Sequence, residues 1–136
     1  MEYNFLLVEG QNLLYEDKSK LYSLNKESLE ILAQEYTLIS NKIPQENSLV
    51  SKIINLVENN ETIVSFEKVT SALKEIENNQ IVSHLNREDF RKISYPIITR
   101  TDHIKKYLIN NSYLFSIDTF LNSSSFQGVE LDSWYQ

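Results

Sequence analysis

Three short apolar runs separated by polar turns occupy the first 24 residues of the chain. The runs cover residues 3–8, 12–15 and 21–24, with Gly10 after the first and a charged stretch before the third. Runs of this length that are bounded by turn residues are typical of β-strands joined in hairpins. The N-terminal part therefore predicts a three-stranded antiparallel sheet.

The region after this sheet has apolar residues at helical spacing. Asn25 is suited to cap a helix, because its side-chain carbonyl can accept hydrogen bonds from the amides of the first turn. Leu24 can pack against Leu29 across that turn. The spacing predicts one helix over residues 26–38 and a second over residues 47–59.

A third helix is predicted over residues 65–77, with Ser65 as its cap. Its apolar residues recur at intervals of three or four, which places them on one helix face. They are Phe66, Val69, Leu73 and Ile76.

The last third of the chain is less regular. We expect a short helix from Asn86 that ends before Pro96, because the residue before a proline avoids the helical conformation. A further helix is expected near residues 102–110 and a strand over residues 113–121. Residues 129–136 form either a strand or a loose tail.

The predicted fold class is α+β. A small winged-helix-like domain, with the three-stranded antiparallel sheet and three helices, is expected over residues 1–83. A helix and strand extension follows over residues 84–136. The core is expected to bury Leu29, Leu32, Ile53, Val69 and Leu73.

Composition excludes several kinds of site. The 136 residues include no cysteine, which excludes disulfides and thiolate zinc sites, and only two histidines. His84 and His103 are separated in sequence and are expected to be ordinary surface residues, so no metal is predicted. Neither glycine belongs to a phosphate-binding loop pattern. We therefore expect no catalytic residues, no cofactor and no enzymatic activity.

Charge and hydropathy restrict the partners. A net charge of −6 argues against nucleic-acid binding, because a duplex repels a surface of its own sign. No apolar run is long enough to span a membrane, and the N-terminus does not resemble a signal peptide. A cytoplasmic location without membrane contact is expected.

Residues 10–82 resemble the PqqD-like family, the peptide-binding domains called RiPP recognition elements. The resemblance rests on GQNLLY (residues 10–15), KLYSLN (20–25), SLEIL (28–32), LVSKII (49–54), FEKV (66–69), LKEI (73–76) and QIV (80–82). Such domains often precede radical-SAM peptide-modifying enzymes, and residues 94–121 resemble the linker that follows in those enzymes. The cluster-binding cysteines of the enzymes are absent from this chain.

The resemblance implies a non-catalytic accessory protein that binds a peptide, such as the leader peptide of a precursor, for a peptide-modifying enzyme. The peptide would add a strand to the edge formed by Lys20, Leu21, Tyr22 and Ser23. The third helix would complete the groove through Lys68, Val69, Ala72 and Leu73.

An alternative hypothesis is a small acidic inhibitor or immunity protein of phage or bacterial conflict. The negative charge would then complement a basic enzyme and accelerate encounter. The sequence leaves open the identity of the partner, the oligomeric state and the role of Trp134 and Tyr135.

Overall fold

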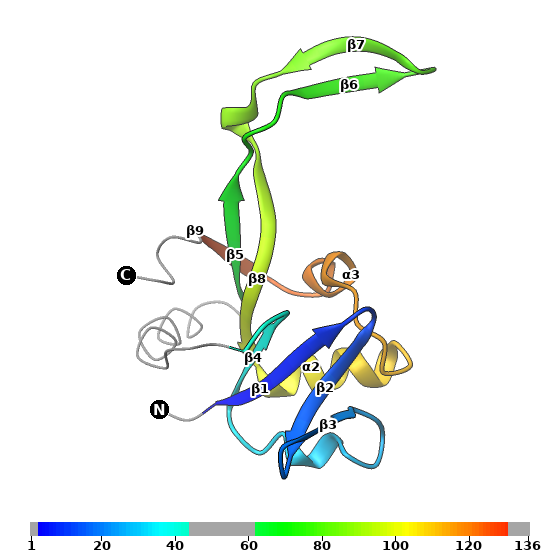
Figure 1. Cartoon of the computed structure of the whole chain (residues 1–136), viewed down its shortest axis with the longest axis vertical. Helices are drawn as coiled ribbons and strands as arrows, with labels where there is room; N and C mark the ends of the chain where they lie inside the picture. Colours follow the sequence, from blue (N-terminus) through cyan, green and yellow to red (C-terminus); the bar gives the residue numbers. More distant parts are fainter. Residues whose placement is uncertain (1–2, 44–61, 131–136) are drawn as a thin grey trace.

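A seven-stranded mixed sheet is the main element of the computed structural model, which describes residues 3–43 and 62–130 (Figure 1). The strand order across the sheet is β3-β2-β1-β4-β8-β5-β9. The strands are β1 (Asn4–Glu9), β2 (Asn12–Asp17), β3 (Lys20–Ser23), β4 (Tyr36–Ser40), β5 (Thr62–Lys68), β8 (Arg91–Arg100) and β9 (Phe126–Glu130).

The N-terminal antiparallel meander is confirmed. β1 pairs with β2, and β2 with β3, through two tight turns. Gly10 has a φ of +61° in the first turn, and Lys18 and Ser19 have φ values of 51° and 67° in the second. Positive φ at these positions matches the twist of the flanking strands, which is why such turns are favoured in hairpins.

The predicted helix over residues 26–38 is wrong. Asn25 does act as a cap, because its Oδ1 accepts hydrogen bonds from the amides of Glu27 and Ser28, each at 3.0 Å. The turn continues only as the 3-10 turn η1 (Leu29–Ile31), and β4 follows. All five residues of β4 are buried, and a strand buried on both faces shows a continuous run of buried residues instead of alternation.

The predicted helix over residues 65–77 is also wrong. The chain instead forms β5 and then a separate hairpin of β6 (Leu73–Glu77) and β7 (Gln80–Leu85). Asn78 and Asn79, expected to end a helix, adopt φ values of 52° and 65° and form the hairpin turn. We call residues 66–93 the arm, because this segment extends away from the body of the molecule (Figure 1).

The short helix expected before Pro96 is reduced to the 3-10 turn η3 (Arg87–Asp89), which Asn86 caps by accepting from the amide of Glu88. Pro96 lies inside β8 and does not end an element, and the Tyr95–Pro96 peptide bond is cis. β8 pairs antiparallel with both β4 and β5.

The expected helix near residues 102–110 is confirmed as α2 (Thr101–Asn110). The strand expected over residues 113–121 is wrong, because this segment contains α3 (Ile117–Asn122). β9 then pairs parallel with β5 at the edge of the sheet. The predicted helix over residues 47–59 and the pair Trp134 and Tyr135 lie outside the described residues.

The core consists of two apolar clusters on opposite faces of the sheet. Consecutive residues of β8, Ile97 and Ile98, alternate between the clusters, as side chains in a strand must. The larger cluster includes residues of α2 and α3. Of the predicted core residues, Leu32 is buried, Leu29, Val69 and Leu73 are half-buried, and Ile53 is outside the described residues.

The winged-helix prediction is thus overturned by a mostly β architecture. Of its three helices, those predicted over residues 26–38 and 65–77 are replaced mainly by strands, and the third lies outside the described residues, which hold two α-helices at other positions. The boundary predicted after residue 83 lies within β7, and the ladder between β5 and β8 joins residues from both sides of it.

No helix among the described residues has both the length and the apolar character needed to cross a lipid bilayer.

Replacement of Ile98 by Ala should lower the free energy of unfolding by about 2–5 kcal/mol, the usual cost of emptying a buried aliphatic site. The control is the same replacement at Ile109, because Ile109 is 57% exposed whereas Ile98 is fully buried. Urea unfolding of both variants checks this, and equal losses at Ile98 and Ile109 would contradict the assigned core.

Candidate functional site

The order of the strands reverses at the centre of the sheet. From β1 the chain adds β2 and β3 on one side, and β4 then pairs with the other side of β1, in parallel. In open α/β sheets, ligands bind outside the carboxyl ends of the parallel strands at such a switch point. The carboxyl ends of β1 and β4 are therefore the first candidate site, which we call the switch-point edge.

Polar residues lie at the carboxyl end of β4 and directly after it. Leu7 lies opposite Ser40 in the parallel ladder, so the two strands end at nearly the same level. Ser40 is 4% exposed, and its Oγ accepts a hydrogen bond from the amide of Lys42 at 3.4 Å. Asn41 and Lys42 are exposed. The edge thus presents a carboxamide and a cation, with the hydroxyl of Ser40 buried behind them.

Further groups come from β8 and α3. The register of β8 with β4 places Tyr95 just beyond Ser40 at the same edge. Burial, and secondly the charge of Asp118, raise the pKa of Tyr95. The amide of Phe115 donates to the carbonyl of Gln11 at 2.8 Å, which holds the segment before α3 against the turn between β1 and β2.

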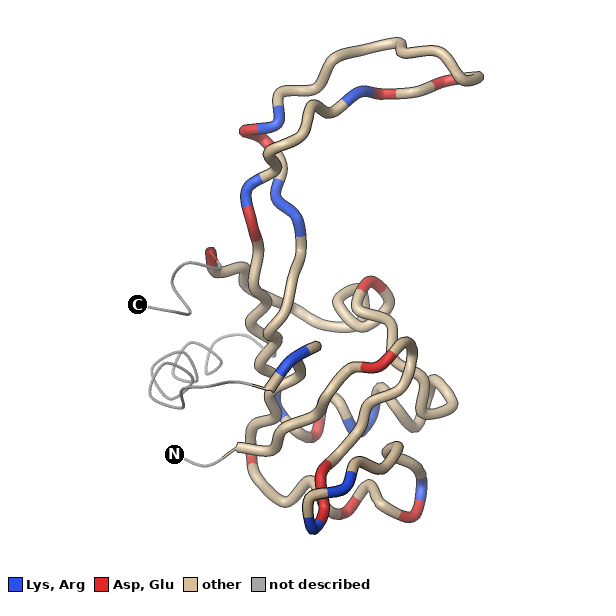
Figure 2. Tube along the Cα trace, in the orientation of Figure 1, with Lys and Arg blue, Asp and Glu red and all other residues tan. Residues whose placement is uncertain are grey.

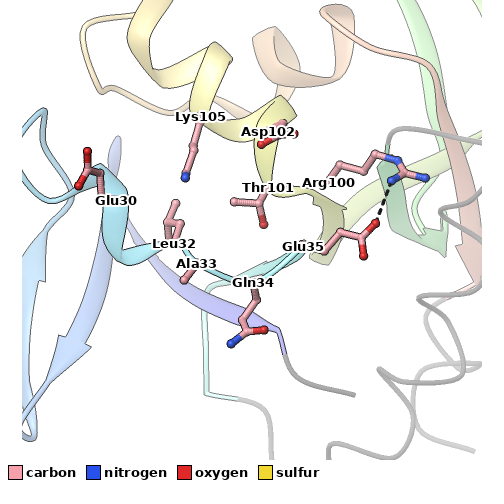
Figure 3. A pocket seen from close by; sticks show the side chains of 9 residues that line it. All are labelled: Glu30, Leu32, Ala33, Gln34, Glu35, Arg100, Thr101, Asp102 and Lys105. Carbon is pink, nitrogen blue, oxygen red and sulfur yellow. Dashed lines mark hydrogen bonds and ion pairs between the residues drawn. The ribbon is translucent and has the colours of Figure 1, made fainter.

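A polar pocket lies at the opposite edge of the sheet, where β4 begins and β8 ends (Figure 3). Its volume is about 460 Å³. Figure 3 shows side chains of both charges around it, from the segment before β4 and from the start of α2. They are Glu30, Leu32, Ala33, Gln34, Glu35, Arg100, Thr101, Asp102 and Lys105.

The side chain of Asn4 forms hydrogen bonds with residues that line this pocket. Its Nδ2 lies 3.1 Å from the carbonyl oxygen of Gln34 and from the Oγ1 atoms of Thr37 and Thr101. Its Oδ1 accepts from the amide of Gln34 at 3.2 Å. The Oγ1 atoms of Thr37 and Thr101 are 2.7 Å apart. One half-buried side chain thus ties β1 to β4 and to the start of α2.

Arg100 and Asp102 line both this pocket and a second hollow. Nη1 of Arg100 lies 3.4 Å from Oε1 of Glu35, and the guanidinium lies 5.8 Å from the ring centre of Tyr36. Such an exposed ion pair contributes only about 0–1 kcal/mol. The second hollow, of about 360 Å³, lies along α2 beside His103 and Tyr107.

Metal-binding groups do not converge in the described ranges, which contain no cluster of three or more His, Cys, Asp or Glu residues able to hold an ion. His84 lies in β7 on the arm. His103 lies on α2, with its ring 4.9 Å from that of Phe120.

The structure separates the residues predicted to bind a peptide. Lys20, Leu21, Tyr22 and Ser23 form the exposed edge strand β3, as predicted. Lys68, Val69, Ala72 and Leu73 lie at the base of the arm, away from β3 (Figure 1). The helix that would have joined them into a groove is replaced by strands.

Sequence reasoning missed Ser40, Asn41 and Lys42. The available signal was a run of β-branched and apolar residues, Thr37 to Ile39, followed directly by polar ones. Thr37 and Leu38 were assigned to the helix over residues 26–38, so the end of a strand was not recognised there.

Comparison with solved structures shows a cytidylyltransferase-like fold. The chain is similar to the 4-diphosphocytidyl-2C-methyl-D-erythritol synthase of Anaerococcus prevotii, with a TM-score of 0.55 and 19% identity, over 76% of this chain and 53% of that one. It is similar to the 2-C-methyl-D-erythritol 4-phosphate cytidylyltransferase of Thermus thermophilus, with a TM-score of 0.55 and 18% identity, over 76% of this chain and 55% of that one.

A third similar structure is the bifunctional IspDF of Campylobacter jejuni, with a TM-score of 0.53 and 22% identity, over 77% of this chain and 28% of that one. The chain spans about half the length of the first two structures. No family model matches the sequence, and no curated protein does.

These likenesses overturn the resemblance to RiPP recognition elements. The fold is shared with the synthase and the cytidylyltransferase named above, and a winged helix is excluded by the seven-stranded sheet. The predictions of a non-catalytic accessory or inhibitor protein, and of a chain without enzymatic activity, are contradicted as well, because two of these similar structures are named as a synthase and a cytidylyltransferase.

Replacement of Asn4 by Ala should lower the free energy of unfolding by about 1–3 kcal/mol, because partly buried partners lose their hydrogen bonds. The matched control is Asn12→Ala, at an exposed position that begins the neighbouring strand. Thermal and urea unfolding measure the stability of both variants. An Asn4 variant as stable as the Asn12 variant would contradict a stabilising role for the hydrogen bonds of Asn4.

Replacement of Tyr95 by Phe should make the free energy of unfolding fall less steeply as the pH rises in alkaline solution. Burial and Asp118 raise the pKa of Tyr95 in the folded state, so the unfolded chain ionises first. The contribution of Tyr95 to the free energy of unfolding is fully present below the ordinary tyrosine pKa. It is lost as the pH rises through the pKa of Tyr95 in the folded state. Urea unfolding between about pH 8 and about pH 11 checks this. Identical alkaline slopes for wild type and variant would refute it.

Proposed function

We propose that the chain is a nucleotidyltransferase-type domain that binds a nucleoside triphosphate at the switch-point edge. The observation that carries the proposal is the reversal of strand order between β1 and β4 in a sheet with a cytidylyltransferase-like fold. Cytidine triphosphate is the donor to test first, because the similar structures are named as cytidylyltransferases.

The polar groups of this edge suit a phosphate ligand. The ammonium group of Lys42 can neutralise phosphate charge, and the side chain of Asn41 can donate hydrogen bonds to phosphate or ribose oxygens. The carboxylate of Asp118 lies near Tyr95 on the same side of the sheet. A bound divalent cation would offset its repulsion of a triphosphate.

The reaction that follows from this proposal is transfer of a nucleotidyl group to a phosphorylated alcohol. An oxygen of the acceptor phosphate attacks the α-phosphorus of the triphosphate. The bond from that phosphorus to its bridging oxygen breaks, and pyrophosphate leaves with those electrons. Positioning and charge neutralisation dominate catalysis of such a step, so the protein needs no nucleophile of its own. A cytoplasmic location, where the triphosphate is available, is part of the proposal.

Replacement of Lys42 by Ala should weaken the binding of magnesium CTP about tenfold or more, because a hydrogen bond to a charged group is lost. Lys105→Ala is the matched control, since Lys105 lines the polar pocket at the opposite edge. Isothermal titration calorimetry measures both. Failure of the wild-type chain to bind CTP would refute the proposal, and loss of binding only in the Lys105 variant would move the site to the polar pocket.

Turnover is measured separately by pyrophosphate release. Full-length protein is incubated with magnesium CTP and a panel of phosphorylated alcohols that includes 2-C-methyl-D-erythritol 4-phosphate. We expect pyrophosphate release that depends on the presence of the acceptor. Binding of CTP without release for any acceptor would leave a nucleotide-binding domain and refute the transferase activity.

A further inference from the structure

The polar pocket at the opposite edge of the sheet takes no part in the proposed nucleotide site. Its volume of about 460 Å³ falls within the range of roughly 300–1,000 Å³ that is usual for small-molecule sites. The pocket lies where β4 begins and β8 ends, whereas the nucleotide is assigned to the carboxyl end of β4. A molecule bound in this pocket would therefore be a second ligand.

The walls of the pocket are held in place by the fold itself. Leu32 and Thr101 are each 3% exposed, and Leu32 belongs to the larger apolar cluster. The amide of Thr101 donates to the carbonyl of Glu35 at 2.9 Å, and the side chain of Asn4 bonds to both Gln34 and Thr101. A site that is already ordered loses little conformational freedom when a ligand binds, which favours affinity.

Five charged side chains line the pocket, and only two of them are paired. Arg100 forms an ion pair with Glu35. The side chains of Glu30, Asp102 and Lys105 form no ion pair or hydrogen bond with any residue that the structure describes. The pocket therefore offers two free carboxylates and one free ammonium group to a ligand.

These three free groups border the same space. Lys105 follows Asp102 by three residues on α2, and this spacing places both side chains on one side of the helix. Lys105 is half-buried, and Figure 3 shows its side chain extending from α2 into the pocket, toward the segment that carries Glu30 and Leu32. Figure 2 shows both signs of charge along the start of α2. A ligand in the pocket would thus meet acidic and basic groups together.

The charges of a fitting ligand are opposite to those of the free groups. Two carboxylates call for two cationic groups, and one ammonium group calls for one anionic group. A free α-amino acid with a cationic side chain carries this set, because it has an α-ammonium group, a side-chain cation and a carboxylate. A triphosphate does not fit, since like charges repel and the pocket holds three acidic side chains.

We propose that the polar pocket binds a free basic α-amino acid. The carboxylate of the ligand pairs with Lys105, and its two cationic groups pair with Glu30 and Asp102. This site is separate from the nucleotide site, because the two lie at opposite edges of the sheet.

Isothermal titration calorimetry of the full chain with lysine and three analogues tests the charge set. Norleucine lacks the side-chain cation, and cadaverine lacks the carboxylate. Nα-acetyl-lysine lacks the α-ammonium group, as does a lysine at the end of a peptide. Each analogue should bind about fivefold or more weakly than lysine, because one hydrogen bond between charged groups is lost. No binding of lysine, or equal binding of any analogue, would overturn the proposal.

Variants of the lining residues locate the site. Glu30→Gln should weaken lysine binding about fivefold or more, whereas Glu27→Gln, at an exposed acid outside the pocket, should not. Lys105→Met should remove the preference for lysine over cadaverine, because the partner of the carboxylate is lost. Lys106→Met, at the next residue and outside this pocket, should retain that preference.

Circular dichroism confirms that each variant is folded. Unchanged lysine binding in the folded Glu30 variant, or a retained preference in the folded Lys105 variant, would contradict the site.

A competition experiment separates the two proposed ligands. Saturating magnesium CTP should leave the affinity for lysine unchanged. Displacement of lysine by CTP would refute a separate amino-acid site. Lysine binding with the expected charge preferences, in a chain that fails to bind CTP, would support this site and refute the nucleotide site alone.

Discussion

Strand β8 pairs along one side with β4 and along the other with β5, so its backbone joins the two halves of the sheet. At one end it passes directly into α2, and at the other it continues into the arm. Consecutive residues such as Ile97 and Ile98 are buried on opposite faces of the sheet. A single ten-residue strand therefore sets the position of both apolar clusters, of the polar pocket and of the arm.

The two edges of the sheet have different chemical character. At one edge, the hydrogen bonds of Asn4 and Thr101 connect β1, β4 and α2 beside a pocket that is lined by both acidic and basic side chains. At the other edge, strand order reverses, and Asn41 and Lys42 directly follow the buried strand β4. We assign nucleotide binding to the second edge, because ligands of open α/β sheets bind outside the carboxyl ends of the strands at which the order reverses.

Local signals in the sequence predicted the local structure. The hairpins before Asn25, the cap at that residue and the helix near residues 102–110 depend on near neighbours in the chain. Long-range pairing was not predictable in the same way. The helical spacing of Phe66, Val69, Leu73 and Ile76 occurs in a segment that leaves one sheet and enters another, so the periodicity was accidental. A pair of asparagines can end a helix or form a hairpin turn, and the sequence alone does not distinguish these two roles for Asn78 and Asn79. The switch-point edge was missed because it exists only once β4 lies beside β1.

The position of the nucleotide site is the central claim, and amide chemical shifts test it most directly. In a titration of the isotope-labelled full chain with magnesium CTP, the shifts should concentrate at residues 8–11 and 38–43, the carboxyl ends of β1 and β4. Residues 30–35 and 100–105, around the polar pocket, should change little. Shifts confined to the polar pocket, or no shifts at saturating CTP, would contradict this account.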